Sequence, residues 1–193
     1  MNKSLFRILI LFAVGAPMMA VYLWINQREG IDHRLLTMPD YVPFWPHMTI
    51  PYLLMLFAPW FGSFALREQR RFFQYLISIT VIFGVIGSIW YLVPTEMTRP
   101  PTPDGVLYEP HRYLVSQDAP VCIFPCGHVM GPITMIWLLA EEDLRRLRWL
   151  LPLLAIGIVA VATTWQHRPI DIVIGSVISV ICVLLVRKFY PLK

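Results

Sequence analysis

The residues Phe72–Thr95 read FFQYLISITVIFGVIGSIWYLVPT, a run of 24 positions without a charged side chain. A helix needs about 20 apolar residues to cross the hydrocarbon core of a bilayer. This run is long enough to cross a membrane as one helix, and Arg71 and Glu96 mark its two ends.

Five further apolar blocks lie between the other charged residues. They occupy residues 8–27, the stretch between Asp40 and Arg67, and residues 119–140, 149–166 and 169–186. The sequence therefore predicts an all-α fold, a six-transmembrane helix bundle that forms a single domain over residues 1–193. The first block follows Lys3 and Arg7, as the apolar core of a signal peptide follows basic residues. It is longer than such a core, which favours a span that is retained over a signal peptide that is removed.

The composition agrees with this class of protein. Of the 193 residues, 57% are hydrophobic and 15% are charged, whereas an average soluble domain has about 25% charged residues. Three cysteines are too few for a disulfide-rich secreted scaffold. Nucleic-acid binding is not expected either, because no basic run interleaved with aromatic residues is long enough.

The basic residues predict the orientation, since cytoplasmic segments of membrane proteins are enriched in Lys and Arg. With a cytoplasmic N-terminus, eleven of the sixteen basic residues fall on the inner side. These are Lys3, Arg7, Arg67, Arg70, Arg71, Arg145, Arg146, Arg148, Arg187, Lys188 and Lys193. Six spans return the C-terminus to the cytoplasm. The loop 94–125 and the turn 166–170 are then predicted to face outside. The short loops are typical of a protein of a bacterial inner membrane.

Three polar clusters lie at the outer ends of the predicted spans. They are PTEMTRP at residues 94–100, FPCGH at residues 124–128 and TTWQHRPID at residues 163–171. Because all three are predicted on the same side of the membrane, we expect them to form one site.

The residue types in these clusters are suited to an anionic substrate. His128 lies where a span begins, and the free N–H groups of a helix start favour an anion such as phosphate. Asp171 follows His167 by four positions, so its carboxylate can hold one imidazole nitrogen and leave the other free to react. Arg99 and Arg168 supply positive charge. Other interpretations are that Asp171 only caps its helix, that Arg99 extends to the interface and that His128 is an interfacial side chain.

The clusters resemble, in order, the three motifs of the type 2 phosphatidic acid phosphatase superfamily. The matching residues are Arg99-Pro100, Pro125-Cys126-Gly127-His128, and His167 with Asp171. The flanking residues are most similar to the branch that includes inositol phosphorylceramide synthases. The resemblance implies a six-span bundle and a lipid phosphatase or phosphotransferase that needs no metal and no cofactor.

The resemblance also implies the role of each residue. His167 would attack phosphorus and form a phosphohistidine, Asp171 would orient His167, and His128 would protonate the leaving group. The residues that hold the phosphoryl group would be Arg99, Cys126, Gly127 and Arg168. The substrate would be a lipid phosphate in the outer leaflet.

Three positions depart from the family pattern. Leu92 replaces a lysine, Cys126 a serine and Val161 an arginine. The alternative function is therefore a catalytically weakened relative that binds lipid phosphate or acts as a membrane partner subunit. Its partner would be another membrane protein, or further copies of the chain in a homo-oligomer. A small transporter is less favoured, because the spans contain few ionisable residues.

Cys126 also allows two other interpretations. It could form a disulfide with Cys122, or join Cys122 and His128 in a metal site. Serine replacement in a phosphate-binding loop is the interpretation we favour, and the expected site contains no metal.

Overall fold

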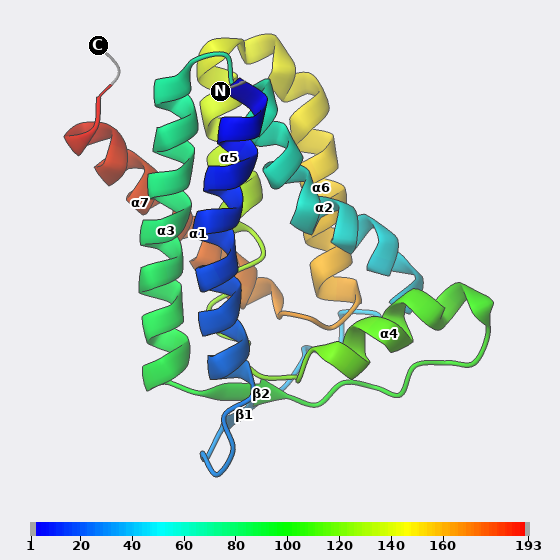
Figure 1. Cartoon of the computed structure of the whole chain (residues 1–193). Helices are drawn as coiled ribbons and strands as arrows, with labels where there is room; N and C mark the ends of the chain where they lie inside the picture. The colour runs from blue at the N-terminus through cyan, green and yellow to red at the C-terminus, as the bar shows by residue number, and fades with distance from the viewer. Residues whose placement is uncertain (1–2, 192–193) are drawn as a thin grey trace.

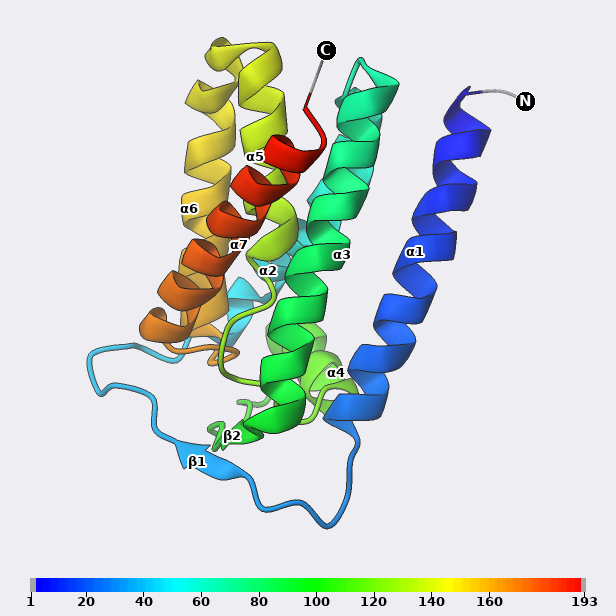
Figure 2. The ribbon, with the colours of Figure 1, turned by 90° about the vertical axis from the view of Figure 1, so that its left-hand side faces the viewer.

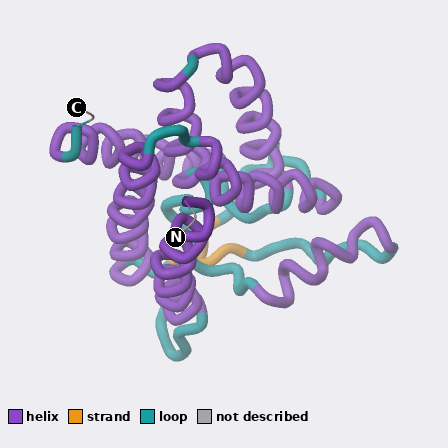
Figure 3. Tube along the Cα trace, turned by 45° about the horizontal axis from the view of Figure 1, so that its top comes forward, coloured by secondary structure: helices purple, strands orange, loops and turns teal. Residues whose placement is uncertain are grey.

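Seven α-helices account for most of residues 3–191, the part of the chain that the structure, a computed structural model, describes. The helices are α1 (Lys3–Asn26), α2 (Thr49–Gly62), α3 (Gln69–Leu92), α4 (Glu109–Gln117), α5 (Met130–Glu142), α6 (Leu147–Thr163) and α7 (Pro169–Phe189). Two short strands, β1 (Arg34–Leu36) and β2 (Thr95–Met97), pair in parallel (Figures 1 and 3). The predicted helical class is confirmed.

Five helical segments within the described residues are long and apolar enough to cross a membrane. They are Lys3–Asn26, Pro46–Ala65, Gln69–Leu92, Leu144–Thr163 and Pro169–Phe189. Their outward faces expose large apolar side chains, including Phe12, Leu54, Phe61, Leu153 and Val173. Such a surface is compatible with contact with lipid and with an integral membrane protein.

The fourth predicted span, residues 119–140, is helical only in its second half. Helix α5 has 13 residues, which corresponds to about 20 Å and is shorter than the roughly 30 Å hydrocarbon core. Pro120 and Pro125 interrupt the first half, because proline donates no backbone hydrogen bond and disfavours helix in the residue before it. The helix begins at Met130, close to the predicted start at His128, but it is too short to form a full span, and six full spans are not confirmed.

The non-helical half of this block lies inside the bundle. Helix α5 packs against α2, α3, α6 and α7, whereas α1 lies at the periphery beside α3 (Figure 2). In the loop before α5, Ile123, Cys126 and Val129 are almost completely buried. Protein thus covers this irregular backbone on all sides of the loop's buried residues.

The three polar clusters gather at one end of the bundle, as the sequence predicted. The end of α3, the loop before α5 and the α6–α7 turn all lie there, together with α4 (Figure 1). The pairing of β1 with β2 and a bridge between Glu96 and Val121 join the loops at this end. That this end faces outside, with both termini in the cytoplasm, stays a prediction.

Gly175 of α7 is needed where the helix meets the buried loop. A Cβ atom at this position would lie 2.1 Å from the carbonyl oxygen of Cys126, a backbone atom. We expect Gly175→Ala to push the loop away from α7 and to lower the free energy of unfolding by about 1–3 kcal/mol. Thermal unfolding in detergent measures this effect.

Gly84→Ala is the matched control within α3. A Cβ atom at Gly84 meets nothing within 4 Å, and alanine favours helix over glycine. The melting temperature of this variant should stay the same or rise. An unchanged melting temperature for Gly175→Ala would contradict the described contact between loop and helix.

Candidate active site

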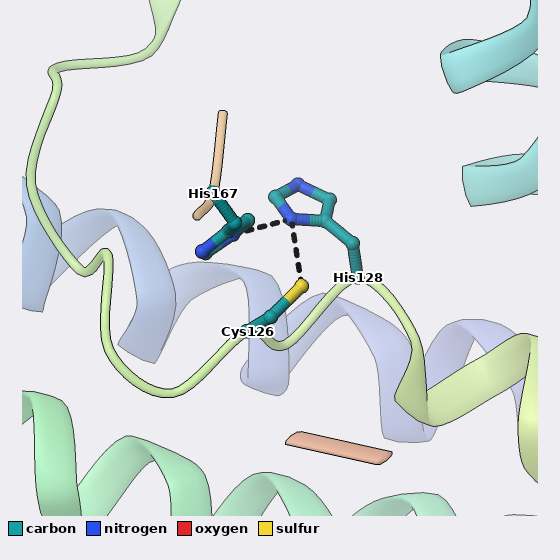
Figure 4. A group of neighbouring side chains, drawn as sticks. All are labelled: Cys126, His128 and His167. Atoms are coloured by element: carbon teal, nitrogen blue, oxygen red, sulfur yellow. Dashed lines mark hydrogen bonds between the residues drawn. The ribbon is translucent and has the colours of Figure 1, made fainter. Parts of the chain in front are cut away.

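His128 and His167 contact each other directly at the end of the bundle where the clusters meet. His128 lies just before α5, and His167 lies in the turn between α6 and α7. The Nδ1 atom of His128 is 2.7 Å from the Nε2 atom of His167, and the rings meet edge to face (Figure 4). The structure thus brings the two sequence-predicted histidines together across 39 positions of the chain.

The hydrogen bonds around the two rings assign their tautomers. The Nδ1 atom of His167 is 2.6 Å from the carbonyl oxygen of Ile123, which can only accept, so Nδ1 carries the proton and Nε2 keeps its lone pair. His128 must then donate from Nδ1 to His167. The hydroxyl of Tyr52 in turn donates to Nε2 of His128, at 2.7 Å. The result is a chain of three donations from Tyr52 to Ile123.

Side chains of α3 and β2 hold the loop that supplies the Ile123 carbonyl. The Oγ1 atom of Thr95 accepts hydrogen bonds from the backbone N–H groups of residues 123 and 124, both at 3.1 Å. The indole N–H of Trp90 donates to the carbonyl of Pro125 at 2.9 Å. These bonds fix the carbonyl that orients His167.

Cys126 and Gly127 have packing roles in this loop. The backbone N–H of Cys126 donates to the carbonyl of Asp171 at 3.0 Å, so this N–H is not free to hold a phosphoryl oxygen. The expected contact of Gly127 with the phosphoryl group stays a prediction. The Cys126 side chain is buried, which raises the pKa of the thiol to about 12 and keeps it neutral at pH 7. A Cβ atom at Gly127 would lie 2.6 Å from the ring of Trp90.

Asp171 does not orient His167, contrary to the sequence-based expectation. Its fully buried carboxylate accepts hydrogen bonds from the backbone N–H and the guanidinium of Arg168, at 2.7–3.0 Å. At the third position of α7, the carboxylate reaches back to the unpaired N–H at the helix start. The capping interpretation is therefore confirmed, and the Ile123 carbonyl takes the place expected for Asp171.

Arg99 belongs to a buried polar network beside the histidines. Its guanidinium donates to the carboxylate of Asp118 at 3.2 Å and to the side-chain oxygen of Gln166 at 2.9 Å. Asp118 also accepts a hydrogen bond from the hydroxyl of Tyr22 in α1. An open pocket of about 440 Å³ lies next to Arg99, lined by residues 96–102, Val115 and Pro120. Neither histidine lines this pocket.

Both histidines are neutral at pH 7. Burial lowers the pKa of His128 to about 4, and it lowers the pKa of His167 well below 6.5. The negative charge of Asp118 opposes this shift in the pKa of His128, and the neighbouring His128 ring lowers the pKa of His167 further. Neutral rings are what the assigned tautomers require.

Sequence reasoning missed several of the groups that build the site. Tyr52 and Asp118 carry no motif, and their partners His128 and Tyr22 lie 76 and 96 positions away. A backbone carbonyl such as that of Ile123 leaves no signal in side-chain patterns. Gln166 precedes His167 in the third cluster, and this position in the sequence is what could have indicated that it belongs to the site.

The cysteines are free within residues 3–191, so the disulfide between Cys122 and Cys126 is not formed. Cys126, His128 and His167 each direct one metal-binding atom into a group that lies within 4.8 Å (Figure 4). Cys122 lies outside this group, contrary to the metal alternative drawn from the sequence.

Comparison of the chain with protein-family models, with curated proteins and with solved structures found no match.

The buried histidine pair makes stability depend on pH. An unfolded histidine takes a proton near pH 6.5, whereas folded His128 does so only near pH 4. Between these values the unfolded chain binds more protons, so the free energy of unfolding falls as the pH is lowered from 6.5 to 4. Melting temperatures of the detergent-solubilised protein across this range measure the effect.

The control variants separate this effect from general acid denaturation. His128→Gln removes the titrating group and should reduce the fall in melting temperature, whereas replacement of the exposed His47 by glutamine should leave it unchanged. Identical slopes in wild type and His128→Gln would refute the assignment.

Proposed function

We propose that this protein transfers the phosphoryl group of a lipid phosphate through His167, to water or to an acceptor hydroxyl. The observation that carries the proposal is the His167 imidazole, held by the Ile123 carbonyl with the lone pair of Nε2 directed at His128. An imidazole lone pair of this kind is a nucleophile. The order of the three motifs and the apolar helices around them support a lipid phosphate as the substrate class.

The reaction begins when the phosphoryl group enters between the two rings and replaces their hydrogen bond. The negative charge of the phosphate raises the pKa of His128, so His128 takes up a proton with the substrate. The Nε2 atom of His167 forms a bond to phosphorus, the bond from phosphorus to the leaving oxygen breaks, and that oxygen receives a proton from His128. Neutral His128 then removes the proton of the attacking water or hydroxyl as the phosphohistidine is cleaved.

The positive field for the phosphate comes from Arg99 and Arg168. Each arginine is paired with a carboxylate, that of Asp118 or Asp171, so a phosphate must compete with these ion pairs. The arginines hold the reacting group less strongly than unpaired cations would. We therefore expect the protein to turn over lipid phosphate slowly.

The alternative function, lipid-phosphate binding without turnover, is favoured by one observation. A carbonyl rather than a carboxylate lies behind His167, so the positive charge that develops on the attacking ring is balanced less well. A membrane subunit that binds lipid phosphate needs no such balance.

We expect His167→Ala to abolish phosphate release from a panel of lipid phosphates, among them phosphatidic acid and a polyprenyl diphosphate. His128→Ala should lower the rate about 10²–10⁴-fold, as the loss of a general acid does. His47→Ala, at an exposed histidine that makes no hydrogen bond to either ring of the pair, should keep full activity. Purified protein in detergent or vesicles is assayed for released phosphate and for label retained on histidine.

Equal turnover in wild type and His167→Ala would refute phosphoryl transfer through this residue. Saturable binding of the lipid phosphate with no phosphate release and no labelled histidine would support the binding function instead.

A further inference from the structure

We propose that Cys126, His128 and His167 form a binding site for a thiophilic divalent transition metal ion, with Zn²⁺ as its ligand. The three side chains come from the loop before α5 and from the α6–α7 turn, and their metal-binding atoms converge (Figure 4). One thiol and two imidazoles are a donor set that suits Zn²⁺ and does not suit Mg²⁺ or Ca²⁺.

The distances in the cluster are close to those of a tetrahedral site. With Zn–N near 2.0 Å and Zn–S near 2.3 Å, two ligand nitrogens lie about 3.3 Å apart and a nitrogen and a sulfur about 3.6 Å apart. The two histidine nitrogens are 2.7 Å apart, and the Cys126 sulfur is 3.9 Å from Nδ1 of His128. The third pair, the Cys126 sulfur and Nε2 of His167, lies within 4.8 Å. Side-chain rotations that part the two nitrogens and bring the sulfur closer to both rings would produce the site.

In each ring, the nitrogen that would not bind the metal already has a hydrogen-bond partner, as a metal-binding histidine needs. Nδ1 of His167 donates to the carbonyl of Ile123, and Nε2 of His128 faces the hydroxyl of Tyr52. Such outer partners orient imidazole ligands and raise their affinity for metal. When the ion binds, the proton of His128 moves from Nδ1 to Nε2, where the oxygen of Tyr52 accepts its hydrogen bond. The proton of the Cys126 thiol passes to solvent.

The charges around the cluster do not oppose a cation as strongly as two nearby arginines suggest. Arg99 is paired with Asp118 and Arg168 with Asp171, at 3.2 and 2.7 Å. The thiolate of Cys126 then balances half of the charge of the ion. His128 is only half-buried, so the proposed fourth ligand is a water molecule that reaches the ion from the side of His128.

Bound Zn²⁺ uses the same atoms as the proposed phosphoryl transfer. It occupies Nε2 of His167 and Nδ1 of His128, so metal binding and turnover exclude each other. Only this inhibition rests on the proposed function, because metal binding itself requires nothing but the three ligands.

Co²⁺ is the probe for the site, since a cobalt–thiolate bond gives an intense near-ultraviolet absorption band. We expect the untagged, full-length protein in detergent to bind one Co²⁺ per chain with this band, and Zn²⁺ to displace the cobalt. The measurement on wild-type protein needs no variant. Absence of the thiolate band would overturn the proposal.

Cys126→Ser and Cys122→Ser form a matched pair of variants. Cys122 is also free and buried, but it lies outside the cluster, packed in the apolar core with Trp90 and Ile82. Cys126→Ser should lose the thiolate band and weaken Zn²⁺ binding by more than the roughly 10–100-fold that loss of an outer partner costs. Cys122→Ser should keep both. Equal losses in the two variants would overturn the assignment of Cys126.

The metal titration and the phosphate-release assay fail independently. If the thiolate band appears but no lipid phosphate is turned over, the metal site stands and the proposed function falls. If turnover occurs without the band and is insensitive to Zn²⁺, the metal site falls and the proposed function stands.

Discussion

Residues 121–128 are irregular backbone inside a helical bundle, so their buried polar groups lack the partners that a helix gives its own backbone. Other segments provide them. Thr95 accepts hydrogen bonds from two backbone N–H groups of the loop, and Trp90 donates one to the Pro125 carbonyl. The Asp171 carbonyl in α7 accepts a hydrogen bond from the N–H of Cys126. Meeting this requirement draws the end of α3, the start of α7 and the α6–α7 turn around one loop. The histidine pair lies at the point where these segments meet.

The Ile123 carbonyl fixes the His167 tautomer without adding charge to a buried place. A carboxylate there would have stabilised a charged imidazole, whereas a carbonyl favours a neutral ring with an available lone pair. Such a lone pair can attack phosphorus or bind a metal ion. The two proposed activities thus have a common physical origin in one backbone hydrogen bond.

Hydropathy and charge were sufficient to predict an all-helical, membrane-compatible chain and the gathering of three clusters at one end. They counted the block 119–140 as a full span, because an apolar run looks the same whether it is a helix or a loop buried by other helices. Side-chain spacing placed His128 and His167 correctly. It misassigned Asp171, because in the first turn of a helix the nearest unpaired donor is the backbone N–H at the helix start, here that of Arg168.

The hydrogen bonds that hold the two ends of α1 are formed with segments that the ribosome synthesises at different times. Near its first turns, Arg7 bonds to carbonyls of Ser63 and Leu66. At its other end, the hydroxyl of Tyr22 donates a hydrogen bond to Asp118, which lies 96 positions later in the chain. During synthesis, one end of this peripheral helix can therefore be secured long before the other, and its final attachment must follow emergence of the loop that precedes the histidines.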